Sequence, residues 1–122
     1  MNVLFIGNSY TYYNDMPLLF ERLANSNHKN VTVFSITQGG RQLESYTDTS
    51  DATTMALDAL LERQTFDVCF IQEQSVMPAS DYNRFKIVTI AEYTVGQLLN
   101  TIGNGDFRKR AAKTERYSTN CF

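Results

Sequence analysis

Hydrophobic and polar positions alternate between two patterns along the first 80 residues. Residues 2–6 and 67–71 are short, mainly apolar runs, and residues 31–36 (VTVFSI) are β-branched and alternating; both patterns are typical of strands. Between them, residues 17–24 and 51–64 carry apolar side chains at helical spacing. The pattern therefore predicts the order strand, helix, strand, helix, strand.

The residues around these segments support the predicted boundaries. Pro17 suits a first helical turn, where its missing N–H is not needed, and the polar run 25–30 ends that helix. Ser50 or Asp51 can cap the second helix, and residues 7–14 and 37–49 are predicted to be loops. The second helix is expected to line up apolar residues along one side: Met55, Ala56, Leu60 and Leu61.

Continuous apolar strands that alternate with helices indicate a parallel α/β sheet with right-handed crossovers. A chain of 122 residues has room for one domain. Residues 82–100 could form one helix, although residues 85–90 (FKIVTI) could equally form a strand. Residues 103–122 hold five basic and two acidic residues without an apolar period. We expect a domain over residues 1–102 and a disordered basic tail over residues 103–122.

The composition excludes several classes of function. Lys and Arg number 11 against 13 for Asp and Glu, giving a formal charge of −2, which argues against a nucleic-acid partner held by phosphate contacts. No targeting segment is visible, and no stretch approaches the ~20 apolar residues of a membrane helix, so we expect a cytoplasmic protein without a membrane partner. Two cysteines and one histidine predict neither a disulfide framework nor a metal site, and no cofactor is expected.

In parallel α/β sheets, ligands bind beyond the carboxyl ends of the strands. The segments that follow the three predicted strands read GNSYT (7–11), TQGGR (37–41) and QEQS (72–75). Together they offer a serine on a tight turn, a pair of glycines and a pair of glutamines. Acyl transfer uses such groups, because it needs a hydroxyl nucleophile and N–H donors that hold an oxyanion.

These three segments resemble the sequence blocks of the SGNH (GDSL-like) hydrolase superfamily. GNSY is similar to its Gly-Asp-Ser-Leu block, the diglycine to its glycine block, and QEQS occupies the place of its Gly-x-Asn-Asp block. Glutamine in place of asparagine resembles the carbohydrate acetyl esterase branch. The resemblance covers about residues 2–85. It implies a flavodoxin-like three-layer α/β/α fold and hydrolysis of a small-molecule or carbohydrate ester, often of acetyl groups on sugars.

The resemblance also implies roles for individual residues. Ser9 would be the nucleophile, and its own backbone N–H would be one oxyanion donor. The backbone N–H of Gly40 would be the second donor, with Gly39 as the alternative. The side-chain amide of Gln72 would be the third, with Gln74 as the alternative.

The chain departs from the family in one respect that matters for catalysis. The family carries its catalytic Asp and His near the C-terminus as Asp-x-x-His, and no such block occurs here. His28 is rejected as the base because it lies between the first helix and the second strand, at the opposite edge of the sheet from Ser9. We therefore expect the front half of such a domain, incomplete at its C-terminus and weak or inactive as an esterase.

Two other functions remain open from sequence: a non-catalytic module that binds an anion or a carbohydrate at the strand-end loops, and an assembly partner that pairs through an open sheet edge. Smaller expectations concern single residues. Arg41 is expected to be a solvated loop residue, Glu73 to be structural or idle, and Cys69 to pack in the core. Stacking on a sugar and packing on the first helix are equally favoured for three aromatic residues: Tyr10, Tyr12 and Tyr13.

Overall fold

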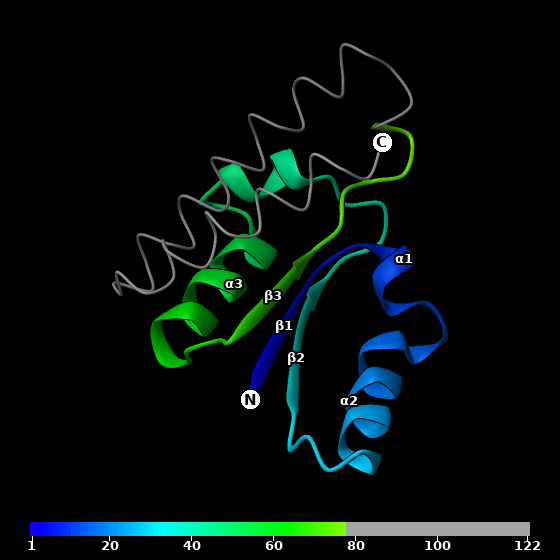
Figure 1. Ribbon diagram of the computed structural model, residues 1–122. Helices are drawn as coiled ribbons and strands as arrows, with labels where there is room; N and C mark the ends of the chain where they lie inside the picture. Colours follow the sequence, from blue (N-terminus) through cyan, green and yellow to red (C-terminus); the bar gives the residue numbers. More distant parts are fainter. Residues whose placement is uncertain (78–122) are drawn as a thin grey trace, which may run out of the picture.

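The computed structural model describes residues 1–77, and its centre is a three-stranded parallel sheet in the order β2-β1-β3 (Figure 1). The strands are β1 (Asn2–Gly7), β2 (Thr32–Thr37) and β3 (Val68–Ile71). Val3 of the central strand lies opposite Val33 on one side and Val68 on the other. The sequence pattern predicted all three strands to within one residue at each end.

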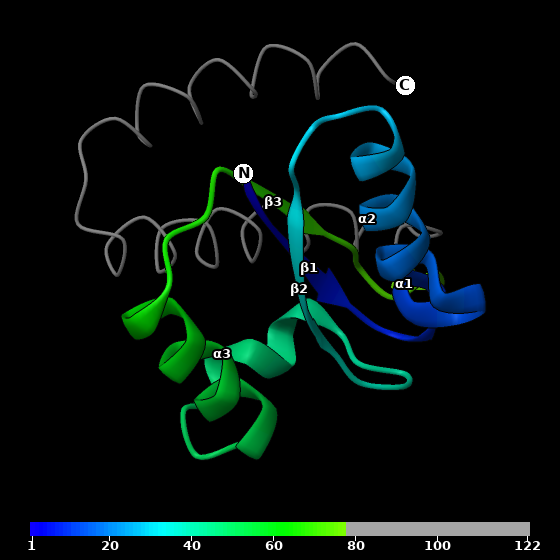
Figure 2. The ribbon, with the colours of Figure 1, turned by 90° about the horizontal axis from the view of Figure 1, so that it is seen from below.

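Helices cover both faces of this sheet. α2 (Met16–Ser26) lies against one face and α3 (Ala52–Arg63) against the other (Figures 1 and 2). β1 is buried on both faces because successive side chains of a strand point to opposite sides: Leu4 and Ile6 face the α3 side, and Val3 and Phe5 the α2 side. The predicted three-layer α/β/α fold is confirmed for the described residues.

α3 begins where the sequence predicted, but it packs through a different side. The Asp51 carboxylate accepts a hydrogen bond from the Thr54 N–H at 2.9 Å and caps the helix. Its buried residues are Thr54, Leu57 and Leu61, whereas Met55 is 57% exposed and Ala56 is exposed too. The predicted packing side was wrong at Met55 and Ala56 because it counted apolar residues, while the polar Thr54 takes part in the buried contacts of the helix.

Both predicted loops contain short helices. Residues 7–14 include α1 (Ser9–Tyr12) and the start of the 3-10 helix η1 (Tyr13–Asp15), and residues 37–49 include the 3-10 helix η2 (Leu43–Thr47). α1 forms because the Asn8 side chain accepts a hydrogen bond from the Tyr10 N–H, which caps its first turn. η2 buries Leu43 and Tyr46, which lie three residues apart and so share one side of a 3-10 turn.

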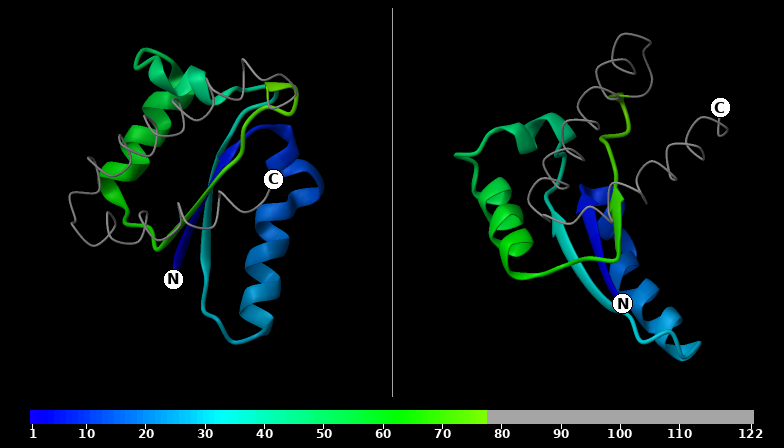
Figure 3. Two further views of the ribbon diagram at one scale, coloured as in Figure 1. Left: turned by 45° about the horizontal axis from the view of Figure 1, so that its top comes forward. Right: turned by 60° about the vertical axis from the view of Figure 1, so that its left-hand side comes forward.

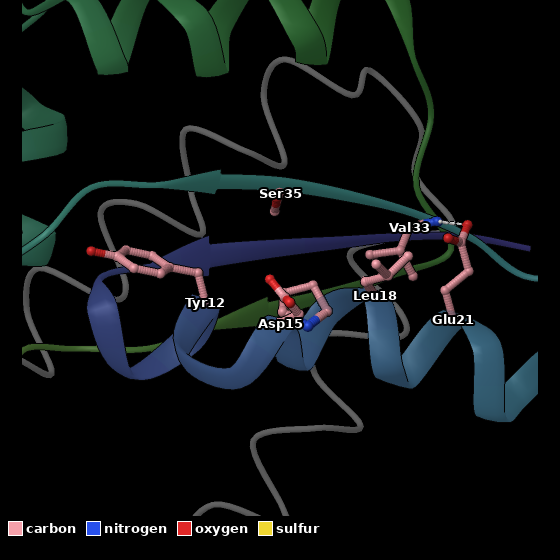
Figure 4. A pocket seen from close by; sticks show the side chains of 7 residues that line it. Tyr12, Asp15, Leu18, Glu21, Val33 and Ser35 are labelled. Carbon is pink, nitrogen blue, oxygen red and sulfur yellow. Dashed lines mark hydrogen bonds between the residues drawn. The ribbon is translucent and has the colours of Figure 1, made fainter.

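A side chain of α2 forms a hydrogen bond with the outer edge of β2. Thr32 and Gln38 donate their N–H groups to the β1 side, so the Val33 N–H points outward, away from the sheet. The Glu21 carboxylate accepts that N–H at 3.0 Å (Figure 4). This hydrogen bond fixes α2 to the strand it precedes.

The predictions made for residues 82–100 and for the boundary at residue 103 lie outside the described residues. Within residues 1–77, no helix has the length and apolar character needed to cross a membrane.

Candidate active site

The segments that follow the three strands lie side by side at the carboxyl edge of the sheet (Figures 1 and 3). Backbone hydrogen bonds continue the strand ladders past the strand ends: the Gln38 N–H donates to Gly7 O at 3.2 Å, and the Gln72 N–H donates to Ile6 O at 2.9 Å. The topology thus brings together the three segments in which the sequence placed its candidate residues.

Asn8 joins all three segments. It is 1% exposed. Its Nδ2 donates to Arg41 O in the second segment at 2.9 Å, and its backbone N–H donates to Gln72 Oε1 in the third at 3.1 Å. Its Oδ1 accepts the Tyr10 N–H of α1. A buried amide with every polar group engaged fixes the relative positions of its partners, and Asn8 is the residue directly before Ser9.

Gly7 is needed because the chain approaches itself closely next to Asn8. A Cβ at Gly7 would overlap Thr11 Oγ1 and would lie 2.8 Å from Gln72 Oε1. Thr11 is 3% exposed, and its Oγ1 donates to the same Gln72 Oε1 at 2.8 Å. The absence of a side chain at Gly7 therefore lets α1 and the third segment come into direct contact.

Ser9 is the first residue of α1, and its side chain is half-buried. Within residues 1–77 neither its Oγ nor its N–H has a hydrogen-bond partner, and only its carbonyl is engaged, by the Tyr13 N–H. A hydroxyl and an adjacent N–H that are both without a partner at a strand end are the groups that a serine nucleophile needs.

Gly39 and Gly40 are exposed and form the middle of a β-turn. The Arg41 N–H donates to Gln38 O at 3.2 Å, and Gly40 has a φ of +69°. A positive φ at the third position alone is typical of a type II turn, which favours glycine there. The Tyr12 hydroxyl lies beside this turn, because a Cβ at Gly39 would be 3.2 Å from it.

Gln72 and Gln74 differ in the hydrogen bonds that their side-chain amides form. The Gln72 oxygen accepts from the Asn8 N–H and the Thr11 hydroxyl, and its amide nitrogen donates to Glu73 O. Because the Asn8 N–H requires an acceptor, this amide cannot be flipped, and one N–H of its NH₂ group remains available. The Gln74 oxygen accepts the Val76 N–H at 2.9 Å.

Glu73 is structural. Its Oε1 accepts the Leu43 N–H at 3.1 Å and the Gln74 N–H at 2.6 Å, so its carboxylate ties the third segment to the stretch that follows the glycines. The expectation for Cys69 is also confirmed: it packs against the α3-side core, and burial raises the pKa of its thiol to about 12.

The prediction for Arg41 was wrong. Its side chain is 4% exposed and forms an ion pair with Asp51 at 2.6 Å. The hydrogen bond from Arg41 lowers the pKa of the Asp51 carboxyl to about 2. Burial raises the pKa of Tyr46, an effect that the charge of Arg41 opposes; the guanidinium carbon lies 4.1 Å from the centre of that ring.

Neither a base nor a metal centre accompanies Ser9 in the part of the chain that the structure describes. His28 is exposed in the connection from α2 to β2, at the amino-terminal edge of the sheet, so its rejection as the base is supported. Residues 1–77 contain no group of acidic, histidine and cysteine side chains that could hold a metal ion.

A hollow of about 220 Å³ lies between α2 and β2, beside the strand-end segments (Figure 4). Tyr12 lines it and also contacts the glycine turn, whereas Ser9, Gly40 and Gln72 do not line it.

The side chains of Tyr10 and Tyr13 are 68% and 70% exposed. They therefore do not pack against α2, which is the helix that the sequence predicted first.

Three residues of this arrangement were missed by the sequence analysis: Asn8, Thr11 and the buried Arg41. An asparagine directly before a helix is a recognisable capping signal, and it could have pointed to Asn8. No local pattern indicates that an arginine after two exposed glycines folds back into the protein.

A comparison with solved structures bears on this geometry. The chain matches a putative SGNH hydrolase from Slackia heliotrinireducens with a TM-score of 0.66 and 23% sequence identity, over 84% of this chain and 52% of that one. The two proteins share one fold. This chain spans about half the length of that SGNH hydrolase. No protein-family model matches the sequence, and no curated protein matches it.

Proposed function

We propose that this chain supplies the nucleophile and the oxyanion donors of an SGNH-type serine ester hydrolase. Ser9 is the proposed nucleophile. The N–H groups of Ser9 and Gly40 are the proposed oxyanion donors, with Gly39 as the alternative to Gly40. The remaining N–H of the Gln72 amide is the third, with Gln74 as its alternative.

The chemistry assigns one step to each group. Ser9 Oγ attacks the ester carbonyl carbon and its proton leaves to a base. The carbonyl oxygen becomes an oxyanion, which the N–H donors stabilise more strongly than the neutral ester oxygen. The alcohol then departs with a proton, and water hydrolyses the acyl group from Ser9.

The observation that carries the proposal is the set of hydrogen bonds around Asn8. One buried side chain holds the second segment at Arg41 O, while its backbone holds the third at Gln72. The next residue is Ser9, whose Oγ is unengaged within residues 1–77. A fold shared with an SGNH hydrolase adds support.

Turnover by this chain should be weak because the only histidine lies at the opposite edge of the sheet. Without a base, the hydroxyl of Ser9 remains protonated at neutral pH. Sites that lose a triad member retain roughly 10³–10⁴-fold acceleration over water when the oxyanion hole persists. A polypeptide that supplies Asp-x-x-His is expected to restore the missing activity.

The direct test is the intact mass of the protein after treatment with a fluorophosphonate. In this reaction an Oγ–P bond forms, the P–F bond breaks, fluoride leaves and the hydroxyl proton passes to solvent. We expect one adduct that is absent from Ser9→Ala. Thr11→Ser serves as a matched control, because it keeps the hydrogen bond to Gln72 and should be labelled like the parent. A folded parent protein that gains no adduct even when the Asp-x-x-His polypeptide is added would contradict the proposal.

The finer part of the proposal is that the ester is an acetyl ester of a small molecule or a carbohydrate. Glutamine in the third segment supports it, as in the acetyl esterase branch that the sequence resembles. Acetate release from acetylated xylan or cellobiose and from 4-nitrophenyl butyrate should be compared after the Asp-x-x-His polypeptide is added. Faster cleavage of the butyrate ester would argue against an acetyl esterase.

A further inference from the structure

The glycine turn is exposed, yet the residue that closes it is among the most buried polar residues of the described chain. Gly39 and Gly40 face solvent. Arg41, the next residue, is 7% exposed overall. Two exposed glycines are therefore joined directly to a buried arginine.

The side chain of Arg41 bridges the turn and α3. Its Nη1 donates to Gln38 Oε1 at 2.8 Å, and its Nη2 donates to Asp51 Oδ2 at 2.6 Å. Nη2 also donates to Thr54 Oγ1 at 2.9 Å and Ser45 O at 3.2 Å. A planar guanidinium can meet several acceptors at once in a fixed geometry, which a lysine cannot reproduce.

The backbone of the same residue fixes the turn from the other side. The Arg41 N–H closes the turn on Gln38 O, and Arg41 O accepts the Asn8 side-chain amide. Both ends of the turn, Gln38 and Arg41, are thus held by one guanidinium, and one end is tied to the residue before Ser9.

The position of one peptide depends on this arrangement. The central peptide of the turn joins Gly39 to Gly40, and the structure has it in the type II form, with Gly40 at a φ of +69°. With two glycines no side chain at the centre of the turn packs against the protein to hold it. The contacts at the ends of the turn therefore set where the Gly40 N–H lies relative to Ser9.

We propose that Arg41 is a positioning residue that holds the glycine turn, and with it the Gly40 N–H, in the place required of an oxyanion donor. Its guanidinium does so by fixing both ends of the Gln38–Arg41 turn to the N-terminus of α3. The catalytic consequence rests on the proposed function, whereas the effect on the position of the glycine turn does not.

The test compares two readouts in four proteins: the rate of fluorophosphonate labelling at Ser9 and the amide NMR signals of Gly39 and Gly40. Arg41→Met removes the bridge, and Arg41→Lys keeps the charge without the fork. The Arg41→Met/Asp51→Asn double variant also removes the charge that Arg41→Met leaves unpaired, and asparagine still caps α3. Leu57→Ala destabilises the same layer without a hydrogen bond to the turn.

We expect labelling at least tenfold slower, together with a shifted or broadened Gly40 amide signal, in Arg41→Met and in the double variant. Arg41→Lys should lie between these and the parent. Leu57→Ala, measured while folded, should match the parent in both readouts. If Arg41→Met does not fold, the double variant decides.

Two results would overturn the inference: parent-like labelling and a parent-like Gly40 amide in the double variant, or an equal loss in Leu57→Ala. If the parent is not labelled even when the Asp-x-x-His polypeptide is added, the proposed function fails, and the Gly40 amide alone decides the role of Arg41. An unchanged signal in the double variant then refutes it, and a changed one supports it.

Discussion

The two faces of the sheet are packed to very different degrees. The α3 side has a core of seven buried residues: Leu4, Ile6, Leu43, Tyr46, Leu57, Leu61 and Phe66. The α2 side has three: Val3, Phe5 and Val31. On α2 the side chains of Leu19 and Leu23 are 53% and 67% exposed. Within residues 1–77 the layer between the sheet and α3 therefore buries its apolar side chains, and we call it the closed layer. The layer between the sheet and α2 leaves two leucines more than half exposed, and we call that side of α2 the open face.

This difference matters for the candidate site because the side chains that hold its segments in place contact elements of the closed layer. Arg41 pairs with Asp51 at the start of α3, and Glu73 holds the N–H of Leu43 at the start of η2. The α2 side contributes aromatic contacts instead, with Phe5 stacked on Phe70 at 4.8 Å and edge-on to Phe20 at 5.5 Å. The geometry of the strand-end segments thus depends mainly on the α3 layer.

The largest expected difference in the free energy of unfolding is between the truncation of a leucine on α3 and the truncation of one on α2. Leu57→Ala on α3 removes a side chain that is 4% exposed, and such truncations destabilise by about 2–5 kcal/mol. Leu23→Ala on α2, at 67% exposure, should stay within about 0.5 kcal/mol. Urea unfolding followed by circular dichroism measures both. Equal losses in the two variants would mean that the faces do not differ in this way.

A smaller loss in the free energy of unfolding is expected in acid, and it arises from the Arg41–Asp51 ion pair at the start of α3. The folded pKa of Asp51 is about 2, below the value of about 3.9 for an unfolded aspartate. Its stabilising contribution is therefore complete only above about pH 5 and is lost progressively as the pH falls to and below the folded pKa of about 2.

We expect the free energy of unfolding to fall less steeply between pH 5 and pH 3 in Asp51→Asn than in the parent. Asp58→Asn, an exposed change on the same helix, is the matched control and should follow the parent. Identical slopes in the parent and Asp51→Asn would show that the ion pair does not form.

Cys69 tests the closed layer chemically. Its thiol packs against the α3-side core with a pKa raised to about 12, so little thiolate exists at pH 8 and alkylation should be slow. Peptide mapping after brief iodoacetamide treatment should find Cys69 unmodified in the folded protein and modified in urea. Rapid labelling without urea would indicate that this layer opens.

The smallest effect is expected on the open face. Leu19→Gln places a polar side chain at a position that is 53% exposed, and the free energy of unfolding should change by no more than about 0.5 kcal/mol. Leu61→Gln, at a position that is 7% exposed on α3, is the contrasting change and should be strongly destabilising. A large loss in Leu19→Gln would show that something covers the α2 face.

The parts of the fold that could be predicted from sequence are those marked by the local spacing of apolar residues or by a capping residue. Short runs rich in apolar and β-branched residues marked the strands, and the Asp51 cap marked the start of α3. The period failed at Met55 because the buried side of the helix includes Thr54, whose burial depends on a hydrogen bond from Arg41, thirteen residues away. Contacts between distant residues of this kind leave no periodic trace.

The candidate site divides in the same way. Its segments were predictable because parallel strands place their carboxyl ends at one edge, which brought Ser9, the glycines and Gln72 into view. The residues that hold these segments together were not predictable. The Asn8 side chain donates to the Arg41 carbonyl 33 residues away, and such a pairing exists only once the sheet has formed.

The hydrogen bond from Val33 to Glu21 also affects the chain while it is being made. Synthesis runs from the amino terminus, so β1, α2 and β2 leave the ribosome before β3 does. During that interval an exposed strand edge can recruit the edge of another nascent chain. Here the helix that emerges just before β2 brings the carboxylate that accepts one of its outward N–H groups, that of Val33. That group is then not available to the edge of another chain, while the side of β1 away from β2 can still pair with β3.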